Sequence, residues 1–339
     1  MNDRYSRQIL FAGIGSVGQS RLLGARAAII GCGALGSAHA EAMARAGVGH
    51  LRIVDRDFVE ASNLQRQTMF IESDARERLP KAVACAKRIA LINSEIEAEA
   101  EVLDVNNSNI ETLIKDCDVV LDGTDNFSTR YLINDACVKH KVNWIYGAAV
   151  GSYGVTMTVR PHVTPCLRCV FEEAPPVGSS PTCDTAGVIM PIISVVAAVQ
   201  VTEALKLLTG KIEKLHNSLM QFDVWSNEWR RIALKEPLPE CVTCGLGKYE
   251  TLEAESGDFA ASLCGRNAVQ VSPQRPTLVD LKALSEKLRP HGEVKVNDYL
   301  LRCTVGEYEL TIFKDARTII RGTDDVSTAR SLYAKYIGT

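Results

Sequence analysis

Short apolar runs alternate with helical patterns along the first part of this chain, and this order restricts its fold more than any other feature. Residues 26–31 and 50–55 are apolar runs of strand length, and the apolar spacing of residues 34–46, closed by Gly47, predicts a helix between them. The same order continues to residue 147. Strands that alternate with helices favour a doubly wound, mostly parallel sheet with helices on both faces, so we predict a Rossmann-like α/β fold.

The pattern changes beyond Gly151. Residues 153–160 alternate as an antiparallel strand does, and residues 219–234 predict a hairpin, so we expect an antiparallel extension of the sheet. Trp225 and Trp229 flank the turn of that hairpin, where we expect them to fill core space. The segment 174–187 is rich in Pro, Gly and Ser, which is typical of a mobile loop. We therefore expect a large domain over 1–248, a polar linker over 249–258, and a small C-terminal α+β domain over 259–339 in which no motif identifies a chemistry.

Composition and charge argue against two classes of partner. The formal net charge of −3, without any basic run, does not indicate nucleic acid. The most apolar stretch, residues 187–201, is shorter than the about 20 residues that span a bilayer, so we expect a buried core helix and no membrane partner. The N-terminus lacks the apolar core of a signal peptide, and 11 cysteines without such a signal suit a reducing compartment. We expect a cytoplasmic protein.

A glycine-rich turn, Gly31-Cys-Gly33-Ala-Leu-Gly36, lies between the first strand and the first helix. Free N–H groups and the helix dipole attract phosphate at such a helix N-terminus. Asp55 ends the next strand, where a carboxylate can hold ribose hydroxyls. These two features predict a nucleotide site and by themselves favour NAD; a turn that serves only the fold is the structural alternative.

Polar and cationic residues after Asp55 indicate a triphosphate rather than a dinucleotide. Residues 55–67 include Asp57, Asn63, Arg66 and Gln67, and Lys81 follows Pro80. A triphosphate needs such groups because its charge must be neutralised during transfer. The alternative is that Arg66 and Lys81 are solvated surface charges.

A second set of polar residues ends the fourth strand, at the carboxyl edge where open α/β sheets bind ligands. Asp125 and Asn126 lie there, and a single carboxylate suits Mg²⁺, which keeps phosphate oxygens among its ligands. The alternative is that Asp125 only caps the helix that follows.

Five segments resemble the ThiF/MoeB family, which is related to ubiquitin-activating enzymes: residues 4–8, the glycine turn, residues 55–67, Pro80-Lys81 and residues 124–126. The resemblance covers residues 1 to about 248, which would be the ATP-binding, adenylating domain. It implies ATP-dependent adenylation of the C-terminal Gly-Gly carboxylate of a ubiquitin-like sulfur-carrier protein, with release of pyrophosphate. The carrier would be of the thiamin (ThiS-like) or molybdopterin (MoaD-like) type, and residues 179–191 favour the thiamin branch.

The resemblance also implies roles for single residues. Gly33, within the turn that Gly31 and Gly36 complete, would approach the nucleotide, and Asp55 would hold the ribose. The expected phosphate-binding residues are Asn63, Arg66, Gln67 and Lys81. Asp125 would organise Mg²⁺. Arg7 is expected to reach into the site of the neighbouring subunit, which implies a catalytic homodimer.

Two Cys-x-x-Cys pairs, Cys166/Cys169 and Cys241/Cys244, offer four thiolates to a metal. Four thiolates suit a closed, structural Zn²⁺ site, and the alternatives are a redox pair or buried free thiols. The resemblance supports zinc, which the family carries at matching positions.

Cys183 lies in the expected mobile segment, just before the long apolar helix. An exposed thiol near a helix start can have a lowered pKa, and related activating enzymes often place a cysteine here. Cys183 is therefore a candidate for sulfur or acyl transfer. The alternative is a bystander, because adenylation needs no cysteine.

Two other functions stay open. An NAD-dependent oxidoreductase would explain the glycine turn and Asp55, but not Asp125 or the two cysteine pairs. A non-catalytic partner subunit of an activating enzyme is the second alternative. If the chain does activate a carrier, a sulfur donor such as a cysteine desulfurase is a further expected partner.

Overall fold

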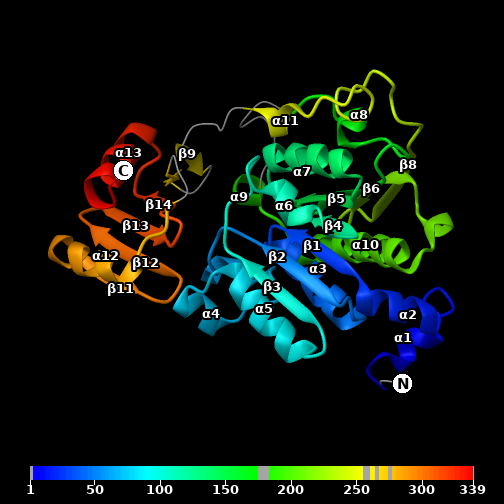
Figure 1. Ribbon diagram of the computed structural model, residues 1–339, viewed down its shortest axis with the longest axis horizontal. Helices are drawn as coiled ribbons and strands as arrows, with labels where there is room; N and C mark the ends of the chain where they lie inside the picture. Colours follow the sequence, from blue (N-terminus) through cyan, green and yellow to red (C-terminus); the bar gives the residue numbers. More distant parts are fainter. Residues whose placement is uncertain (1–2, 175–182, 255–259, 264–266, 274–276, 339) are drawn as a thin grey trace. The chain divides into compact units, whose positions relative to one another are not determined.

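The computed structural model describes residues 3–174, 183–254, 260–263, 267–273 and 277–338, and the chain forms two compact units, Met1–Ala254 and Glu255–Thr339 (Figure 1). The first unit is built on an eight-stranded sheet with the order β3-β2-β1-β4-β5-β6-β7-β8. Its parallel strands are β1 (Arg26–Ile30), β2 (His50–Val54), β3 (Glu97–Glu101), β4 (Val119–Asp122) and β5 (Asn143–Val150). The antiparallel extension is β6 (Tyr153–Val159), β7 (Ser218–Asp223) and β8 (Glu228–Ala233). The predicted doubly wound sheet and its extension are confirmed.

Helices cover both faces of this sheet. One face carries α3 (Ala34–Ala46), α5 (Lys81–Ile92) and α10 (Met190–Thr209), with α2 (Gly15–Gly24) beside α10; the other carries α6 (Ile110–Ile114), α7 (Phe127–His140) and α11 (Glu250–Glu253). The shorter helices are α1 (Ser6–Leu10), α4 (Glu72–Glu77), α8 (Leu167–Val170), α9 (Cys183–Ala186) and the 3-10 turns η1 (Asp3–Tyr5), η2 (Ala61–Asn63) and η3 (Ile212–Lys214). α3 has the predicted bounds and ends as expected, since its C-cap Gly47 takes a left-handed φ of 79°.

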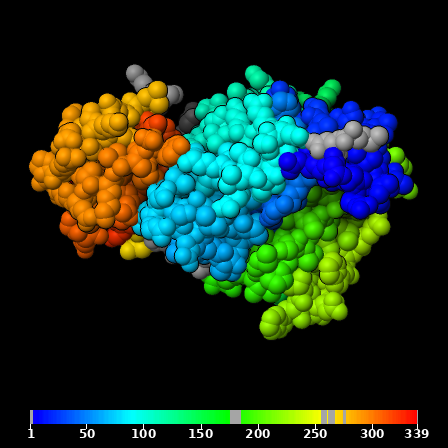
Figure 2. All heavy atoms as spheres, turned by 90° about the horizontal axis from the view of Figure 1, so that it is seen from below, coloured from blue at the N-terminus to red at the C-terminus, as the bar shows by residue number. Residues whose placement is uncertain are grey.

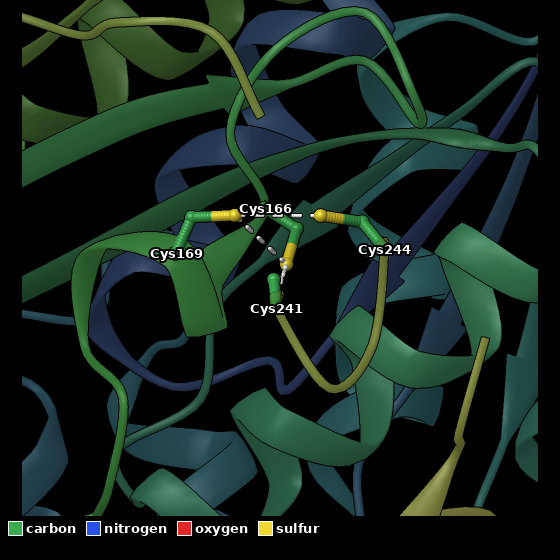
Figure 3. A group of neighbouring side chains, drawn as sticks. All are labelled: Cys166, Cys169, Cys241 and Cys244. Carbon is green, nitrogen blue, oxygen red and sulfur yellow. Dashed lines mark hydrogen bonds between the residues drawn. The ribbon is translucent and has the colours of Figure 1, made fainter. Parts of the chain in front are cut away.

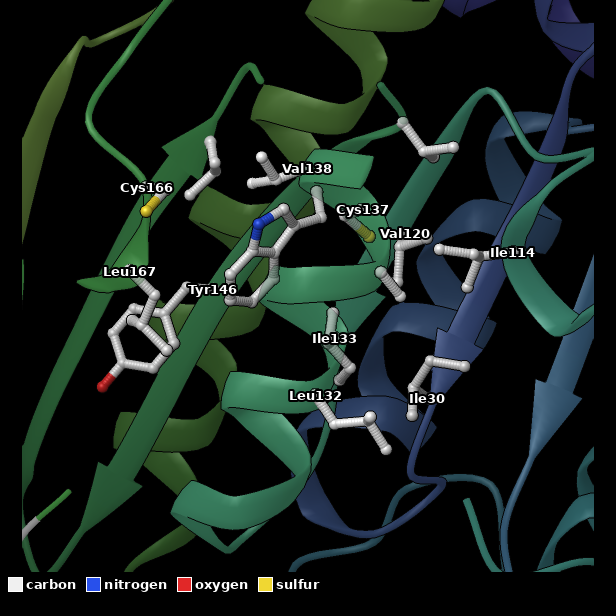
Figure 4. Close-up of a cluster of buried hydrophobic side chains, with 14 of the residues drawn as sticks. Ile30, Ile114, Val120, Leu132, Ile133, Cys137, Val138, Tyr146, Cys166 and Leu167 are labelled. Atoms are coloured by element: carbon white, nitrogen blue, oxygen red, sulfur yellow. The ribbon is translucent and has the colours of Figure 1, made fainter. Parts of the chain in front are cut away.

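The core between α7 and the sheet fixes the position of α7 (Figure 4). Leu132 and Ile133 of α7 belong to one buried cluster with Ile30 of β1 and Val120 of β4. Trp144, on β5, is fully buried in the same cluster. Burial of these side chains holds the N-terminal turn of α7 beside the carboxyl ends of β4 and β5.

α10 is longer than the apolar run that the sequence showed. It has 20 residues with a mean hydropathy of 1.6, so by length and composition it could cross a membrane, and the length argument against a span is wrong. Half of that stretch is buried within the protein, where the helix packs against α3, β5 and β6. This packing is that of the core helix of a globular unit.

The second unit is a six-stranded antiparallel sheet with the order β11-β12-β13-β14-β10-β9. Its strands are β9 (Ala260–Leu263), β10 (Ala268–Val271), β11 (Glu293–Val296), β12 (Leu300–Val305), β13 (Tyr308–Phe313) and β14 (Thr318–Arg321). The helices α12 (Leu281–Leu288) and α13 (Val326–Tyr336) and the turn η4 (Arg289–His291) complete it. Leu284, Leu301, Leu310 and Tyr333 share its single described core, as expected for a small α+β domain.

The segment expected to be a linker, 249–258, contains α11, which the sequence pattern did not predict. α11 lies against α7, and the division between the two units falls after it, at Ala254.

Candidate active site

The glycine turn joins β1 to α3 at the carboxyl edge of the parallel strands. Gly31 has a φ of 84°, the left-handed region that favours glycine. A Cβ on Gly36 would lie 1.8 Å from the Gly31 carbonyl oxygen, and a Cβ on Gly31 would lie 2.8 Å from the carbonyl oxygen of Gly123, just after β4. Packing of the protein itself therefore requires Gly31 and Gly36.

Gly33, the N-cap of α3, differs from these two glycines. A Cβ on Gly33 would meet nothing nearer than the Gly123 carbonyl oxygen at 4.0 Å, so packing does not require a glycine there. No side chain among the described residues caps α3, so the amides of its first turn have no intrahelical or side-chain acceptor. The turn thus leaves open space beside free N–H groups, an arrangement suited to phosphate.

Asp55 follows β2 and accepts two hydrogen bonds at its carboxylate. The amide of Cys32, inside the glycine turn, donates to Oδ2 at 2.6 Å, and the amide of Asp57 donates to Oδ1 at 2.7 Å. Burial raises the pKa of Asp55, while the ammonium of Lys81 opposes that rise. Asp55 is therefore held against the turn, where the sequence predicted a ribose-binding acid.

Lys81 is one of the buried residues of the site, with 6% of its surface exposed. Its Nζ lies 3.2 Å from Oδ2 of Asp57, and its amide donates to the Asp57 carbonyl at 2.9 Å. A bridge between Phe58 and Pro80 brings the two segments together. The alternative of a solvated surface charge is wrong for Lys81, which faces the acids of the site.

The loop after Asp57 contains the other predicted phosphate ligands. Asn63 is buried, and its Oδ1 accepts from the Glu60 amide at 3.0 Å, which closes η2. Arg66 is half-buried and donates to the Ser62 carbonyl at 2.9 Å. Gln67 has 4% of its surface exposed, and its Oε1 has no hydrogen-bond partner in the described part of the chain. A buried amide oxygen without a partner is what a site for a polar ligand would leave.

Asp125 and Asn126 lie in the short turn between β4 and α7. Oδ1 of Asn126 accepts from the Thr129 amide at 2.9 Å, so Asn126 and not Asp125 caps α7. The Asp125 side chain is exposed and receives one long hydrogen bond, 3.4 Å from Nδ2 of Asn126. The carboxylate therefore stands at the carboxyl edge of the sheet, where it could hold a cation.

Three polar residues behind Asp125 escaped the sequence prediction: Asp122, Arg130 and Gln200. Nε of Arg130 donates to Oδ2 of the fully buried Asp122 at 3.2 Å. Nε2 of Gln200, on α10, donates to the carbonyls of Asp122 and Ile145 at 3.1 and 3.0 Å. An arginine on an otherwise apolar helix face was the one signal in the sequence, because a buried charge needs a partner.

Arg7 lies on α1, apart from all of these residues. It is exposed, and the next side chain, Gln8, donates to the carbonyl of Ala46 at the C-terminal end of α3 at 2.8 Å. The glycine turn is at the other end of α3, which has 13 residues and is therefore about 20 Å long. One chain does not bring Arg7 to its own site.

The structure brings the four predicted metal ligands together (Figure 3). The Sγ atoms of Cys166, Cys169, Cys241 and Cys244 all lie within 4.8 Å of one another, and three of the separations are 3.3, 3.6 and 3.9 Å. Zinc–sulfur bonds of about 2.3 Å at tetrahedral angles would put sulfurs about 3.8 Å apart, so the four thiols fit Zn²⁺ without an open coordination position.

Neighbouring residues of α7 hold the two cysteine pairs. Oδ1 of Asn134 accepts from the amide of Leu167 at 2.8 Å, and Oδ1 of Asp135 accepts from the hydroxyl of Thr243 at 2.8 Å. The other oxygen of Asp135 accepts from the amide and hydroxyl of Thr251, on α11, at 3.0 and 2.6 Å. α7 therefore contacts the cysteine centre and α11, at the end of the first unit, and its own N-terminus lies at the carboxyl edge of the sheet.

The backbone of Cys183 begins α9, but its side chain and residues 175–182 lie outside what the structure describes. Past α9, the chain joins the end of β5: the Gly151 amide donates to the Gly187 carbonyl at 2.8 Å, and Ile189 donates to the Gly151 carbonyl at 3.0 Å. The carboxyl end of β5 is thus tied to the start of α10.

Fold and site together define an α/β nucleotide-binding protein with a tetracysteine centre, and the chain belongs to the ThiF family, whose sequence model matches residues 5–243. The resemblance to this family is confirmed. The chain is 48% identical over 342 residues to the sulfur carrier protein ThiS adenylyltransferase of Bacillus subtilis, with 100% of both chains covered. It is 38% identical over 251 residues to the SAMP-activating enzyme E1 of Haloferax volcanii, covering 74% of this chain and 92% of that one. A crystal structure of E. coli MccB with ATP shares the fold, with a TM-score of 0.63 at 22% identity over 72% of this chain and 74% of that one.

Proposed function

We propose that this chain is an adenylyltransferase that uses ATP to activate the C-terminal carboxylate of a ubiquitin-like sulfur carrier. The observation that carries the proposal is the end-to-end 48% identity to an enzyme named for this reaction. Family membership favours adenylation over the NAD-dependent oxidoreductase. The buried Lys81 beside Asp57 and the exposed Asp125 favour an active enzyme over a non-catalytic partner subunit.

The proposed carrier is of the ThiS type, which would place the enzyme in thiamin biosynthesis. The relative from B. subtilis is named for ThiS and is matched over the whole chain, second unit included. By contrast, the H. volcanii enzyme matches 74% of this chain.

The chemistry follows from the weakness of a carboxylate as an electrophile, since its leaving group would be oxide. An oxygen of the carrier's terminal carboxylate attacks the α-phosphorus of ATP. The bond from that phosphorus to the bridging oxygen breaks, pyrophosphate leaves with the electron pair, and a mixed anhydride of carrier and AMP remains. A sulfur nucleophile can then displace AMP.

The chain's residues position charge around that step, as in other phosphoryl and nucleotidyl transfers. Gly33 leaves the amides of α3 open to phosphate, and Asp55 holds the ribose. Lys81 and Arg66 neutralise charge on the phosphates, with Asn63 and Gln67 beside them. Mg²⁺ held by Asp125 would add positive charge at the leaving pyrophosphate. Zn²⁺ in the cysteine centre would be structural, because four thiolates fill its coordination.

We propose further that the enzyme is a homodimer in which Arg7 serves the partner's site. The length of α3 separates Arg7 from its own glycine turn, and nearby apolar side chains are exposed: Leu10 by 74%, Phe11 by 65% and Val17 by 68%. Figure 2 shows the N-terminal segment that carries them, in blue, on the surface of the first unit. An exposed apolar patch of this kind is typical of an interface.

Mixed dimers test this arrangement. Arg7→Ala and Asp125→Ala subunits, each inactive alone, should regain part of the activity when mixed, because one of the two sites then has both residues. Verified mixed dimers without recovery would contradict a site shared between subunits.

The cellular setting is part of the proposal. We place the enzyme in the cytoplasm, with its carrier and a sulfur donor such as a cysteine desulfurase. Cys183 is the candidate acceptor for sulfur or the acyl group, and Cys183→Ala should leave adenylation unchanged while slowing only a later sulfur step.

ATP–pyrophosphate exchange is the direct test of the reaction. Purified carriers of the ThiS and MoaD types, each with an intact Gly-Gly terminus and a truncated control, would be compared at equal concentration. Exchange that requires the intact ThiS-type terminus is expected. Preference for the MoaD type would change the pathway, and no exchange with either carrier would contradict the proposed reaction.

A further inference from the structure

Arg130 joins the ends of two neighbouring strands through one guanidinium group. It lies in the first turn of α7, with 7% of its side chain exposed. Its Nη2 donates to the Thr124 carbonyl at 2.7 Å and to the Gly147 carbonyl at 3.3 Å. Its Nε donates to Oδ2 of Asp122 at 3.2 Å. The guanidinium therefore ties the end of β4 to β5.

The surroundings of Arg130 require the shape of an arginine as well as its charge. Asp122 is fully buried, and its Oδ1 accepts from the amide and hydroxyl of Thr124 at 2.9 and 2.6 Å. The rings of Phe127 and Tyr146 lie 5.5 Å from the guanidinium carbon. A planar fork can bond several acceptors at once between two rings, whereas a lysine ammonium is a compact point charge.

The pKa shifts agree with this geometry. Burial raises the pKa of Asp122, and Arg130 opposes that rise. Burial also lowers the pKa of Arg130, but the charges of Asp122, Tyr146 and Asp125 outweigh it and leave the pKa above its usual value. Each charge of this buried pair therefore stabilises the other.

Asp125 depends on this network for its position. Thr124 precedes it, and the Thr124 carbonyl accepts the shortest hydrogen bond of Arg130. The Asp125 carboxylate has only the long bond from Asn126 among its hydrogen bonds to described residues. The backbone, rather than a side-chain contact, sets where that carboxylate lies.

We propose that Arg130 is a positioning residue that sets the distance between the Asp125 carboxylate and the end of β5, and thereby the Mg²⁺ requirement of adenylation. The inference rests on the proposed function, in which Asp125 holds Mg²⁺ at the ATP phosphates. The last part of β5, residues 147–150, lies beside this edge, so the same guanidinium fixes both sides of the space in which the carrier's carboxylate would meet ATP.

Arg130→Lys keeps the positive charge and removes the planar guanidinium group with its several donors. A misplacement of about 1 Å costs up to ~100-fold in rate. We expect the rate of ATP–pyrophosphate exchange at low Mg²⁺ to fall by about 10- to 100-fold, and the Mg²⁺ concentration for half-maximal rate to rise by about 10-fold. The KM for ATP should change by less than about 3-fold, because the other nucleotide contacts remain. Excess Mg²⁺ should restore part of the rate.

Cys137→Ala is the matched control. Cys137 lies on the same helix, is fully buried and belongs to the core cluster, so its truncation lowers stability without touching Thr124 or Gly147. It should lower Tm and leave the Mg²⁺ midpoint unchanged. A charge-free double variant, Asp122→Asn with Arg130→Gln, avoids an unpaired buried carboxylate and should reproduce the Mg²⁺ shift if Arg130→Lys does not fold.

Amide hydrogen exchange of residues 123–126 without nucleotide gives a readout that needs no activity. Amide hydrogen exchange should be faster in Arg130→Lys than in the wild-type protein, and unchanged in Cys137→Ala. A wild-type Mg²⁺ midpoint together with wild-type hydrogen exchange in Arg130→Lys would overturn the positioning role. Wild-type protein that catalyses no pyrophosphate exchange would instead contradict the proposed function, and hydrogen exchange would still decide the role of Arg130.

Discussion

Replacing Gly36 and Gly33 by alanine, one at a time, separates the glycine that packing requires from the glycine that a ligand requires. At Gly36 the new Cβ would lie 1.8 Å from the Gly31 carbonyl oxygen, so α3 and the turn must move apart. Overpacking of this kind costs about 1–3 kcal/mol. For a unit of this size that corresponds to a fall in Tm of about 2–12 °C.

At Gly33 the new Cβ would meet its nearest atom, the Gly123 carbonyl oxygen, at 4.0 Å, and the φ of −80° is open to any residue. The fold should lose about 1 kcal/mol or less, the difference between glycine and alanine as an N-cap. The methyl group would occupy the space through which phosphate reaches the amides of α3. A steric cost of about 1–3 kcal/mol there weakens ATP binding by about 5- to 150-fold.

Thermal unfolding with and without ATP measures both effects on the same samples. Gly33→Ala should unfold near the wild-type Tm and lose most of the protection by ATP, while Gly36→Ala should unfold at a clearly lower Tm. Wild-type ATP protection in Gly33→Ala would refute the assignment of Gly33 to the ligand. Equal losses of Tm in the two variants would refute the distinction itself.

Three further perturbations test other parts of the structure. A strong chelator should lower Tm by about 10 °C, because metal binding adds to folding stability. The rate of pyrophosphate exchange per folded molecule should stay near that of untreated enzyme. A large loss of this rate with an unchanged Tm would contradict a structural metal. Asp135→Asn weakens three hydrogen bonds to a buried carboxylate and should lower the free energy of unfolding by about 2–3 kcal/mol in denaturant titrations. Glu213→Gln, at an exposed position, should lower it by less than about 0.5 kcal/mol. Burial lowers the pKa of His39 from 6.5 to about 4, although Oε1 of Gln200 accepts a hydrogen bond from its Nε2. The unfolded chain therefore binds the proton first, and stability should be lost as the pH falls from 6.5 to 4, by up to about 3 kcal/mol. His39→Gln should remove that loss, and an unchanged pH dependence in this variant would show that other groups cause it.

The sequence predicted those parts of the fold that depend on local pattern. The apolar spacing of residues 34–46 and the glycine after them located α3 to the residue, since a helix with one buried face and a left-handed C-cap leaves both signals. The cysteine pairs could also be recognised in the sequence, because ligands of a structural metal are often only a few residues apart. Lys81 was predicted as a phosphate ligand, but its ion pair with Asp57 was not, because that pair joins two segments 24 residues apart.

What the sequence could not show depends on contacts between distant segments. Arg130 looks like one more charged residue of a helix until β4 and β5 supply Asp122, Thr124 and Gly147 as its partners. The interpretation of two tryptophans was wrong for a related reason. Trp225 and Trp229 are 82% and 56% exposed, because the hairpin that carries them ends the sheet at β8, and alternation does not reveal which strand lies at an edge.

The hydrogen bonds of Asp135 decide where the first unit can be cut for separate expression. A fragment that stops at residue 248 keeps all four cysteines but removes Thr251, so two of the three donors to the buried carboxylate of Asp135 disappear. A fragment that stops at Ala254 keeps them, together with the contact of α11 with α7. Residues after the last cysteine ligand, Cys244, therefore help to hold the cysteine centre. A fragment that ends before them would be less stable because α7 loses these hydrogen bonds, and not because the second unit is absent.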